Sequence, residues 1–255
     1  MESLMIDVEE IRVHTTSWGT SEEQIRKDHL ISHLLSALAG LEGFIFFGGT
    51  ALNRIVLVNR RLSEDIDLYL DPASPADTSL ILDGFRAGTR REFPDLLITS
   101  VGTRGDVRTF AVTAEDLTVQ LQVVGTRQEM SRYETALADV ELRYSDLPSA
   151  VALRAPVADA FVAMKCIAYE DRRAPRDLYD LASLARAGAI RPTSIEALRK
   201  SRNFGPIRER YSPTHAPSLD SWETELAHQL FDPGSPLEAL EAVREALGAA
   251  AGWDD

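Results

Sequence analysis

Hydrophobic and polar positions along the first 150 residues follow two periods, which predicts both helices and strands. A capping box at Thr20–Gln24 opens an apolar stripe with helical spacing, so we expect a helix over 21–39. Helical spacing recurs over Thr50–Val58 and Pro75–Glu92. Short apolar or alternating runs predict strands. These strands are Phe44–Phe47, Asp65–Leu70, Leu96–Thr103, Val107–Thr113, Leu117–Val124 and a less regular run, Val140–Tyr144.

The pattern changes after Pro156, where the helical period alone continues. The helices expected there are 157–170, 176–187, 193–201, 221–231 and 236–250. We therefore place a domain boundary near Leu147–Ala155, between an α/β domain over residues 1–150 and a helical domain over 151–255. The fold class is α/β (α+β), a mixed sheet with helices followed by a helical half.

The composition is that of a protein with a sizeable core. The 255 residues are 44% apolar, with no run of 18 apolar residues and no signal-peptide pattern at the N-terminus. The single cysteine, Cys166, fits a reducing compartment, so we expect a cytoplasmic protein without a membrane partner. The net charge of −13 argues against binding of nucleic acid through the whole surface.

One segment, Arg186–Arg210, is net positive within this acidic chain. It carries Arg186, Arg191, Arg199, Lys200, Arg202, Arg208 and Arg210 against Glu196 and Glu209. Such a segment is either a solvated helical face or a contact for the phosphate backbone of a nucleic acid.

Asp65 and Asp67 stand two residues apart in the stretch Arg61–Leu70 and give the clearest sign of chemistry. In a strand, residues i and i+2 share a face, so both carboxylates point one way while Ile66 and Leu68 face the core. Two carboxylates this close repel each other unless a cation lies between them. Mg²⁺ is the natural candidate, because it prefers carboxylate and phosphate oxygens.

A glycine pair, Gly48-Gly49, precedes the aspartates directly after a predicted strand. Glycine lets a ligand approach the backbone closely, and a helix that starts there offers N–H groups to a phosphate. Thr50 would cap that helix, contact a phosphate, or do both. Arg61 and Ser63 would flank a triphosphate, although each also fits a loop as a solvated or turn residue. This order of motifs indicates metal-assisted nucleotidyl transfer.

Lys165 is an isolated lysine in an apolar helical stretch, where its ammonium needs an anion or a route to water. A nucleotide phosphate would satisfy it, and an internal carboxylate is the alternative. Asp177 and Asp180 share one helix face near its start. Asp177 suits the helix dipole, and Asp180 suits Lys165 or the active site, although the sequence does not separate these roles.

Together, several stretches resemble the AbiEii family, nucleotidyltransferase toxins of bacterial toxin–antitoxin systems that include the mycobacterial MenT toxins. The stretches are Arg26–Asp28, Phe47–Leu52, Arg61–Leu68, Lys165 and Arg176–Leu181. The resemblance implies a fold like that of DNA polymerase β and an antitoxin partner. For some members it also implies transfer of nucleotides from an NTP to the 3′ end of tRNA. No signature is matched after Leu181.

The resemblance also assigns residues to roles. It implies phosphate binding by Gly48, Gly49 and Thr50, a metal motif of Ser63, Asp65 and Asp67, and later motifs at Lys165 and Asp180, with Asp177 beside them. One departure concerns a third carboxylate that many superfamily members carry on a later strand. The run Leu117–Val124 has Gln120 and Gln122 at the alternate positions instead, and glutamine is a poor base.

We therefore expect an Mg²⁺-dependent nucleotidyltransferase toxin that uses an NTP and modifies an RNA, with the tRNA 3′ end as the leading acceptor. In this hypothesis Asp65 and Asp67 hold metal, Lys165 neutralises phosphate charge, and Asp180 orients Lys165 or assists the acceptor hydroxyl. The RNA would dock on Arg186–Arg210. Two alternatives remain at this point: a nucleotidyltransferase that modifies a small molecule such as an antibiotic, and a non-catalytic nucleotide-binding protein.

Overall fold

The computed structural model describes residues 6–58, 60–125, 130–201, 207–227, 229 and 232–252, without the side chains of residues 207 and 208. The chain divides into two compact units. The first, called here the sheet unit, is Met1–Ser131 with Thr135–Ala155, and the second, the helical unit, is Arg132–Glu134 with Pro156–Asp255. In the described part of the chain, no helix is long and apolar enough to cross a membrane.

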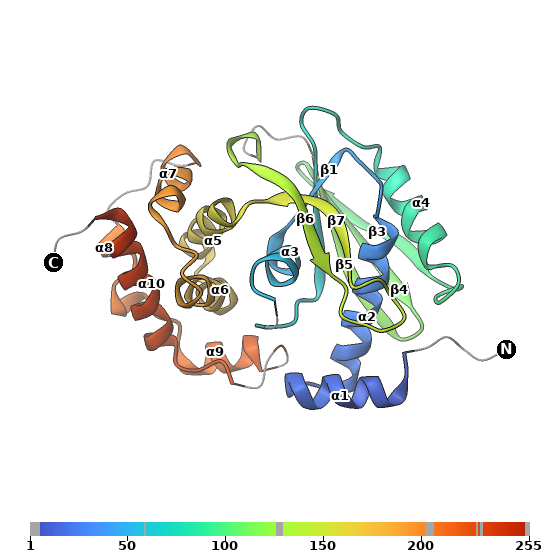
Figure 1. The fold of residues 1–255 in the computed structure, drawn as a ribbon, viewed down its shortest axis with the longest axis horizontal. Helices are drawn as coiled ribbons and strands as arrows, with labels where there is room; N and C mark the ends of the chain where they lie inside the picture. Colours follow the sequence, from blue (N-terminus) through green and yellow to red (C-terminus); the bar gives the residue numbers. More distant parts are fainter. Residues whose placement is uncertain are drawn as a thin grey trace. The chain divides into compact units, whose positions relative to one another are not determined.

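A five-stranded mixed sheet forms the centre of the sheet unit (Figure 1). Its strands are β1 (Phe44–Phe47), β2 (Asp65–Leu70), β3 (Leu97–Arg104), β4 (Val107–Ala114) and β5 (Leu117–Val124), in the order β1-β2-β5-β4-β3. The β2–β5 pair is parallel and the other pairs are antiparallel. The mixed sheet confirms the predicted fold class. Gly102 lies inside β3 beside a shift of register.

Two helices cover the buried face of this sheet. The helix α2 (Glu22–Ala37) packs against β5 and against α4 (Thr78–Thr89). It begins where expected, because the Ser21 side chain accepts a hydrogen bond of 3.2 Å from the backbone N–H of Gln24. The apolar stripe predicted for α2 is fully buried, which confirms its orientation toward the sheet.

The helix α3 (Gly48–Ile55) follows β1 without an intervening loop and packs against β2 and β6. Its N-cap is Phe47, so the helix begins at the first glycine and not, as expected, at Thr50. An N-terminal helix, α1 (Val8–Trp18), was not predicted from the sequence. No residue of α1 is fully buried, but Ile11 and Trp18 pack against the cluster of Ile25, Leu62 and Tyr144.

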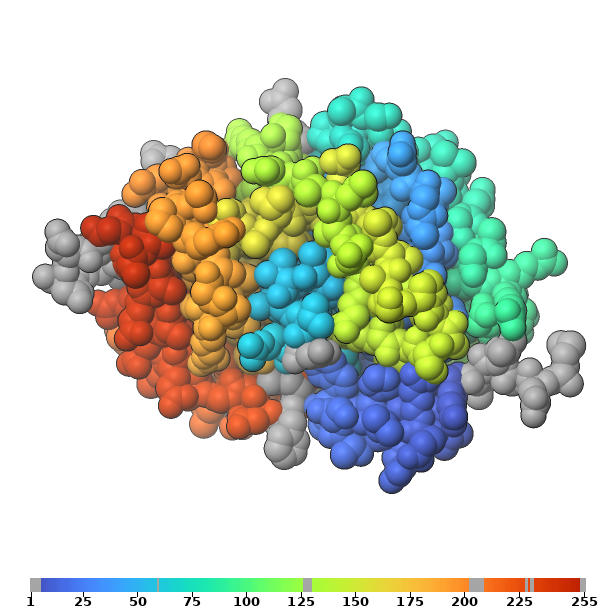
Figure 2. Space-filling model, in the orientation of Figure 1, coloured from blue at the N-terminus to red at the C-terminus, as the bar shows by residue number. Residues whose placement is uncertain are grey.

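A second, two-stranded sheet consists of β6 (Thr135–Glu141) and β7 (Ala150–Pro156). The strand predicted at Val140–Tyr144 was therefore placed too late, and β7 lies where we expected only a domain boundary. The residues Glu141–Asp146, called here the crossing segment, leave β6 and run over α1, α2 and α3. Figure 2 shows the dark blue residues of α1 directly against the yellow-green region that includes this segment.

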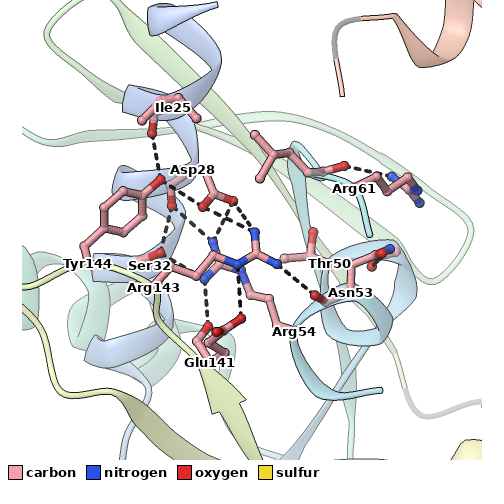
Figure 3. Close-up of polar contacts among 12 residues, drawn as sticks. Ile25, Asp28, Ser32, Thr50, Asn53, Arg54, Arg61, Glu141, Arg143 and Tyr144 are labelled. Atoms are coloured by element: carbon pink, nitrogen blue, oxygen red, sulfur yellow. Dashed lines mark hydrogen bonds and ion pairs between the residues drawn. The ribbon is translucent and has the colours of Figure 1, made fainter. Parts of the chain in front are cut away.

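A buried charge network ties the crossing segment to two helices (Figure 3). Asp28 on α2 lies 2.8 Å from Nη2 of Arg54 on α3 and 3.2 Å from Nη1 of Arg143, and it accepts a hydrogen bond of 3.0 Å from the Tyr144 hydroxyl. Arg54 also donates to the hydroxyl of Ser32 at 2.9 Å and to the carbonyl of Glu141 at 2.8 Å. Burial would raise the pKa of Asp28, but the two arginines outweigh it and lower this pKa.

The helical unit consists of short helices packed around α6. Its described helices are α5 (Ala158–Arg172), α6 (Pro175–Arg186), α7 (Pro192–Ser201), α8 (Ile207–Arg210), α9 (Leu219–Leu226) and α10 (Pro236–Ala251). The helix α6 contacts α5, α9 and α10, and most of its residues are buried. The helices predicted for this half are confirmed, with shifts of a few residues at their ends and an earlier end for α9.

Replacing Asp28 by alanine should lower the free energy of unfolding by about 3–5 kcal/mol, because it leaves Arg54 and Arg143 buried without their carboxylate. Urea unfolding at pH 7 measures the loss. The matched control is Asp83→Ala, which removes an exposed carboxylate 2.8 Å from Arg86 and should change stability little.

Asp28→Ala and the wild-type protein also test how the stability contribution of Asp28 depends on pH. A carboxyl whose pKa is lowered by folding stabilises the protein above its ordinary pKa of 3.8, and this contribution disappears as the pH falls through the lowered value. The difference between Asp28→Ala and the wild type should therefore shrink in acid. A difference that grows in acid contradicts this assignment.

Candidate active site

The first contact of the site is between the glycine turn and an aspartate. The antiparallel pairing of β1 with β2 places Phe47 opposite Asp67, so Gly48 starts α3 directly beside that carboxylate. Gly48 has a φ of +82°, and a Cβ on it would lie 2.0 Å from Oδ2 of Asp67. Only glycine fits, because any side chain would be strained by the left-handed backbone and would displace the carboxylate.

The second glycine makes room for Arg61 and Ser63. A Cβ at Gly49 would lie 3.1 Å from Nη2 of Arg61 and 3.2 Å from Oγ of Ser63. Arg61 is 2% exposed, and its Nη1 donates to the carbonyl of Leu62 at 3.0 Å. The structure therefore gathers Gly48, Gly49, Arg61, Ser63 and Asp67 at one end of α3, and Arg61 is a buried residue of this site, not a solvated one.

Thr50 fixes the first turn of α3 to β2. Its hydroxyl donates a hydrogen bond to the backbone carbonyl of Asp65. The side chain of Asn53 donates to the carbonyl of Gly49 at 3.0 Å, so it holds the same turn from inside the helix. The Thr50 hydroxyl thus positions the strand that carries the aspartates, and any phosphate contact from this residue falls to its backbone N–H.

Asp65 and Asp67 project from one face of β2, as the sequence predicts. Both are partly exposed, whereas Ile66 and Leu68 between and after them are fully buried. The carboxylates therefore stand on the open face of the sheet, at the end where α3 begins. Two carboxylates on one short strand are groups that a cation would stabilise.

The parallel neighbour β5 places its two glutamines beside these aspartates. Gln120 is the register partner of Asp65, and Gln122 is the register partner of Asp67. Both glutamines lie on the open face, since Leu121 between them is fully buried. The strand carries no carboxylate, so at these positions the aspartates meet neutral amides.

The helical unit holds a separate buried cluster around Lys165. Its Nζ lies 3.0 Å from Oδ1 of Asp177 and 2.7 Å from Oδ2 of Asp180. Arg172 adds hydrogen bonds of 2.6 and 2.9 Å to Asp177. Burial would raise the pKa of Asp177, but the charges of Lys165 and Arg172 outweigh it and lower this pKa. Both aspartates therefore contact Lys165, and the internal carboxylates expected as the alternative partner are present.

The basic segment is less positive than its sequence indicates. Arg191 forms an ion pair of 3.1 Å with Asp159, and Arg210 forms one with Glu170. Arg186, Arg199 and Lys200 are exposed. Arg202 and the side chain of Arg208 lie outside the described residues.

Comparison with known families decides the class of protein. The family model described as "Nucleotidyl transferase AbiEii toxin, Type IV TA system" matches residues 29–249, which is most of the chain. The chain belongs to the AbiEii family. It is therefore a nucleotidyltransferase toxin, and membership of a type IV toxin–antitoxin system implies a nucleotide substrate and an antitoxin partner. The match extends far beyond Leu181, where the sequence motifs end.

Solved structures show the same fold. The nucleotidyltransferase toxin MenT4 from Mycobacterium tuberculosis is 20% identical, with a TM-score of 0.64 over 96% of this chain and 89% of that one. JHP933 from Helicobacter pylori is 17% identical, with a TM-score of 0.57 over 91% of this chain and 94% of that one. Among curated proteins, no sequence matches significantly. The predicted family and nucleotidyltransferase fold are confirmed.

The residues that hold α3 in place were not predicted from the sequence. Arg54 and Asn53 stand inside the predicted short helix, and Arg143 stands about 90 residues later. The position of Arg54 indicated that such a contact exists. It interrupts the buried face of a short amphipathic helix, where a charge requires a partner. Its partner Asp28 lies within the motif stretch Arg26–Asp28, but the sequence does not show that the two residues meet.

Gly48→Ala should reduce NTP-dependent release of pyrophosphate by about 100-fold or more, because the added methyl displaces the Asp67 carboxylate by more than the ångström that such losses require. Gly40→Ala is a closely matched control. Gly40 has a φ of +77°, and nothing lies within 4 Å of its added Cβ, so this variant carries the backbone strain without the clash. Equal losses of activity in both variants would show that strain, and not Asp67, is responsible.

Proposed function

We propose that this AbiEii protein transfers nucleotides from an NTP to the 3′ end of tRNA, with Mg²⁺ at Asp65 and Asp67, and so inhibits translation. The observation that carries the proposal is the contact of Gly48 with Asp67, which puts a carboxylate at the start of α3. Backbone N–H groups at a helix start favour phosphate, and a carboxylate pair favours a divalent cation. Nucleotide and metal therefore have binding groups within one small region.

The residues present fit Mg²⁺ in their chemistry. Asp65 and Asp67 offer oxygen ligands on one face of β2, and this ion takes one or two carboxylates together with phosphate oxygens. When bound, Mg²⁺ would stabilise the charge of the triphosphate and of the leaving pyrophosphate. Gly48 and Gly49 leave space for a phosphate against the backbone, and the Ser63 hydroxyl beside Gly49 would donate to it. Arg61 adds a positive charge there.

The acceptor is proposed from the family resemblance and from the exposed basic residues. Arg186, Arg199 and Lys200 are exposed in the segment assigned to RNA, and arginine and lysine neutralise backbone phosphates. The ion pairs of Arg191 and Arg210 limit this surface, and the net charge of −13 repels nucleic acid elsewhere. Those two facts favour a cationic small molecule as the second candidate acceptor.

Lys165 and Asp180 are proposed to serve the same reaction. Lys165 would neutralise phosphate charge, and Asp180, 2.7 Å from its Nζ, would orient it or accept the proton of the acceptor hydroxyl. Asp177 is the structural partner in this proposal. It lies in the first turn of α6 and holds both Lys165 and Arg172, a position that the helix dipole also favours.

Incubation with total tRNA, Mg²⁺ and each α-³²P-labelled NTP in turn should label tRNA from at least one NTP. Asp65→Ala should reduce the label to background with the fold intact, because one metal ligand is lost. Asp83→Ala, an exposed carboxylate on α4, should label like the wild type. Full activity in Asp65→Ala contradicts the metal assignment, and label on no RNA with turnover of a small-molecule acceptor favours the second candidate.

Asp180→Asn and Asp177→Asn should distinguish a residue that takes part in the reaction from one that stabilises the fold. Asp180→Asn is expected to lower kcat while the melting temperature changes less. Asp177→Asn is expected to lower the melting temperature more, since it weakens contacts with both Lys165 and Arg172. Steady-state kinetics and thermal unfolding on both variants provide the comparison, and an Asp180→Asn protein with wild-type kcat rules out a role in the reaction.

A further inference from the structure

Three metal-binding side chains meet at one point in the sheet unit, apart from the aspartates of β2. His29 and His33 lie one turn apart on α2, and Asp146 ends the crossing segment. Oδ2 of Asp146 is 2.9 Å from Nε2 of His29 and 3.0 Å from Nε2 of His33. The two Nε2 atoms are 3.1 Å apart. The three atoms thus form a nearly equilateral triangle.

The rings that supply two corners of this triangle are held by packing. His29 and His33 are each 3% exposed, and both meet Phe93 edge to face, with ring centroids 6.0 and 5.4 Å away. Tyr144 packs against His29 from another direction at 4.9 Å. Fixed rings keep their nitrogens in place whether or not an ion is bound, which lowers the cost of binding one.

Asp146, the carboxylate corner of the triangle, is held in place by the contacts of the two residues before it. Ser145 donates its backbone N–H and its hydroxyl to Glu10 on α1, at 2.9 and 2.8 Å. The Tyr144 hydroxyl shares its proton between Asp28 and the carbonyl of Ile25, which lies 3.1 Å away. The side chain of Asp146 is itself 26% exposed, so water reaches the triangle from that side.

Protonation favours an ion here. Burial lowers the pKa of His29, which favours the neutral imidazole that binds metals. Burial would raise the pKa of Asp146, but the hydrogen bonds and charges of the two histidines outweigh it and lower this pKa.

We propose that His29, His33 and Asp146 bind Zn²⁺, with a solvent molecule as the fourth ligand. Tetrahedral zinc with bonds of about 2.0–2.1 Å needs ligand atoms roughly 3.3 Å apart, so the triangle must open by only a few tenths of an ångström. Imidazole nitrogens select zinc over Mg²⁺, which prefers oxygen ligands. This site is therefore chemically distinct from the carboxylate pair at Asp65 and Asp67.

The position of the site indicates a structural role. Asp146 lies three residues after Arg143, which contacts Asp28, and His29 directly follows Asp28 on α2. Zinc would fasten the end of the crossing segment to α2 beside the network that holds α3. Because ion binding to the folded state alone adds to its stability, zinc should stabilise this part of the fold.

The test is a zinc titration of untagged, full-length protein, stripped with a chelator and kept in excess Mg²⁺ so that the carboxylate pair is occupied. Calorimetry should find one zinc ion per chain. His33→Gln and Asp146→Asn should each weaken binding by more than the roughly 10- to 100-fold that loss of an outer-shell partner costs. The matched control is His215→Gln, in the helical unit, which should bind as the wild type does.

X-ray absorption at the zinc edge keeps the proposal testable if a variant fails to fold. On the wild-type protein it should show two imidazoles and one or two oxygen ligands near 2.0 Å. Circular dichroism checks the fold of each variant, and zinc should raise the melting temperature of the wild type but not of Asp146→Asn. Failure to bind zinc stoichiometrically, or undiminished binding in both folded variants, overturns the proposal.

Discussion

The buried Asp28 carboxylate between Arg54 and Arg143 is the contact on which the position of α3 depends. A helix of eight residues is not stable by itself, so its place is set by what holds its two ends. Thr50 joins the first turn to β2, and Arg54 joins the last turn to α2 and to the crossing segment. Since Gly48 and Gly49 begin this helix, the geometry of the glycine turn rests on a charge network at the far end of α3.

Holding a helix with such a network costs free energy. Removing three charged groups from water costs free energy that their attraction recovers only with good geometry. An apolar contact of similar size would stabilise the fold equally well. Apolar contacts have no preferred direction, however, so they let packed surfaces shift against each other. Arg54 meets the Ser32 hydroxyl and the Glu141 carbonyl as well as Asp28, and those directions fix the helix in rotation and along its axis. We infer that the network mainly fixes the position of α3 and contributes less to the stability of the fold.

Much of the fold and of the active-site turn follows from local patterns. The alternation in β2 predicts that Asp65 and Asp67 share a face, and a capping residue predicts the start of α2, because both effects act over a few residues. The network was not predictable, since Asp28 and Arg143 lie 115 residues apart and nothing local shows that they meet. Neither were α1, whose inward side is only partly buried, and β7, which lies where the composition changes. The contacts of Lys165 with both Asp177 and Asp180 depend on how α5 packs against α6, which local patterns do not show.

The glutamines of β5 bear on the metal site proposed at Asp65 and Asp67. With Gln120 and Gln122 opposite Asp65 and Asp67, the charge at these four positions is −2, which one divalent cation balances. A third carboxylate there would add a base for the acceptor hydroxyl, and an amide is no base. In the proposed reaction, β5 therefore supplies no base for the acceptor hydroxyl.

The crossing segment links the charge network behind α3 to the proposed zinc site. Over six residues it presents Glu141 and Arg143 to the network behind α3, and then Asp146 to the histidines of α2. Asp28 and His29 are consecutive, so a movement of α2 relative to this segment would disturb both contacts together. Zinc at the histidines would oppose that movement without touching the nucleotide site. Its effect on the proposed reaction would therefore be indirect, through the placement of α3, whose first residue lies against Asp67.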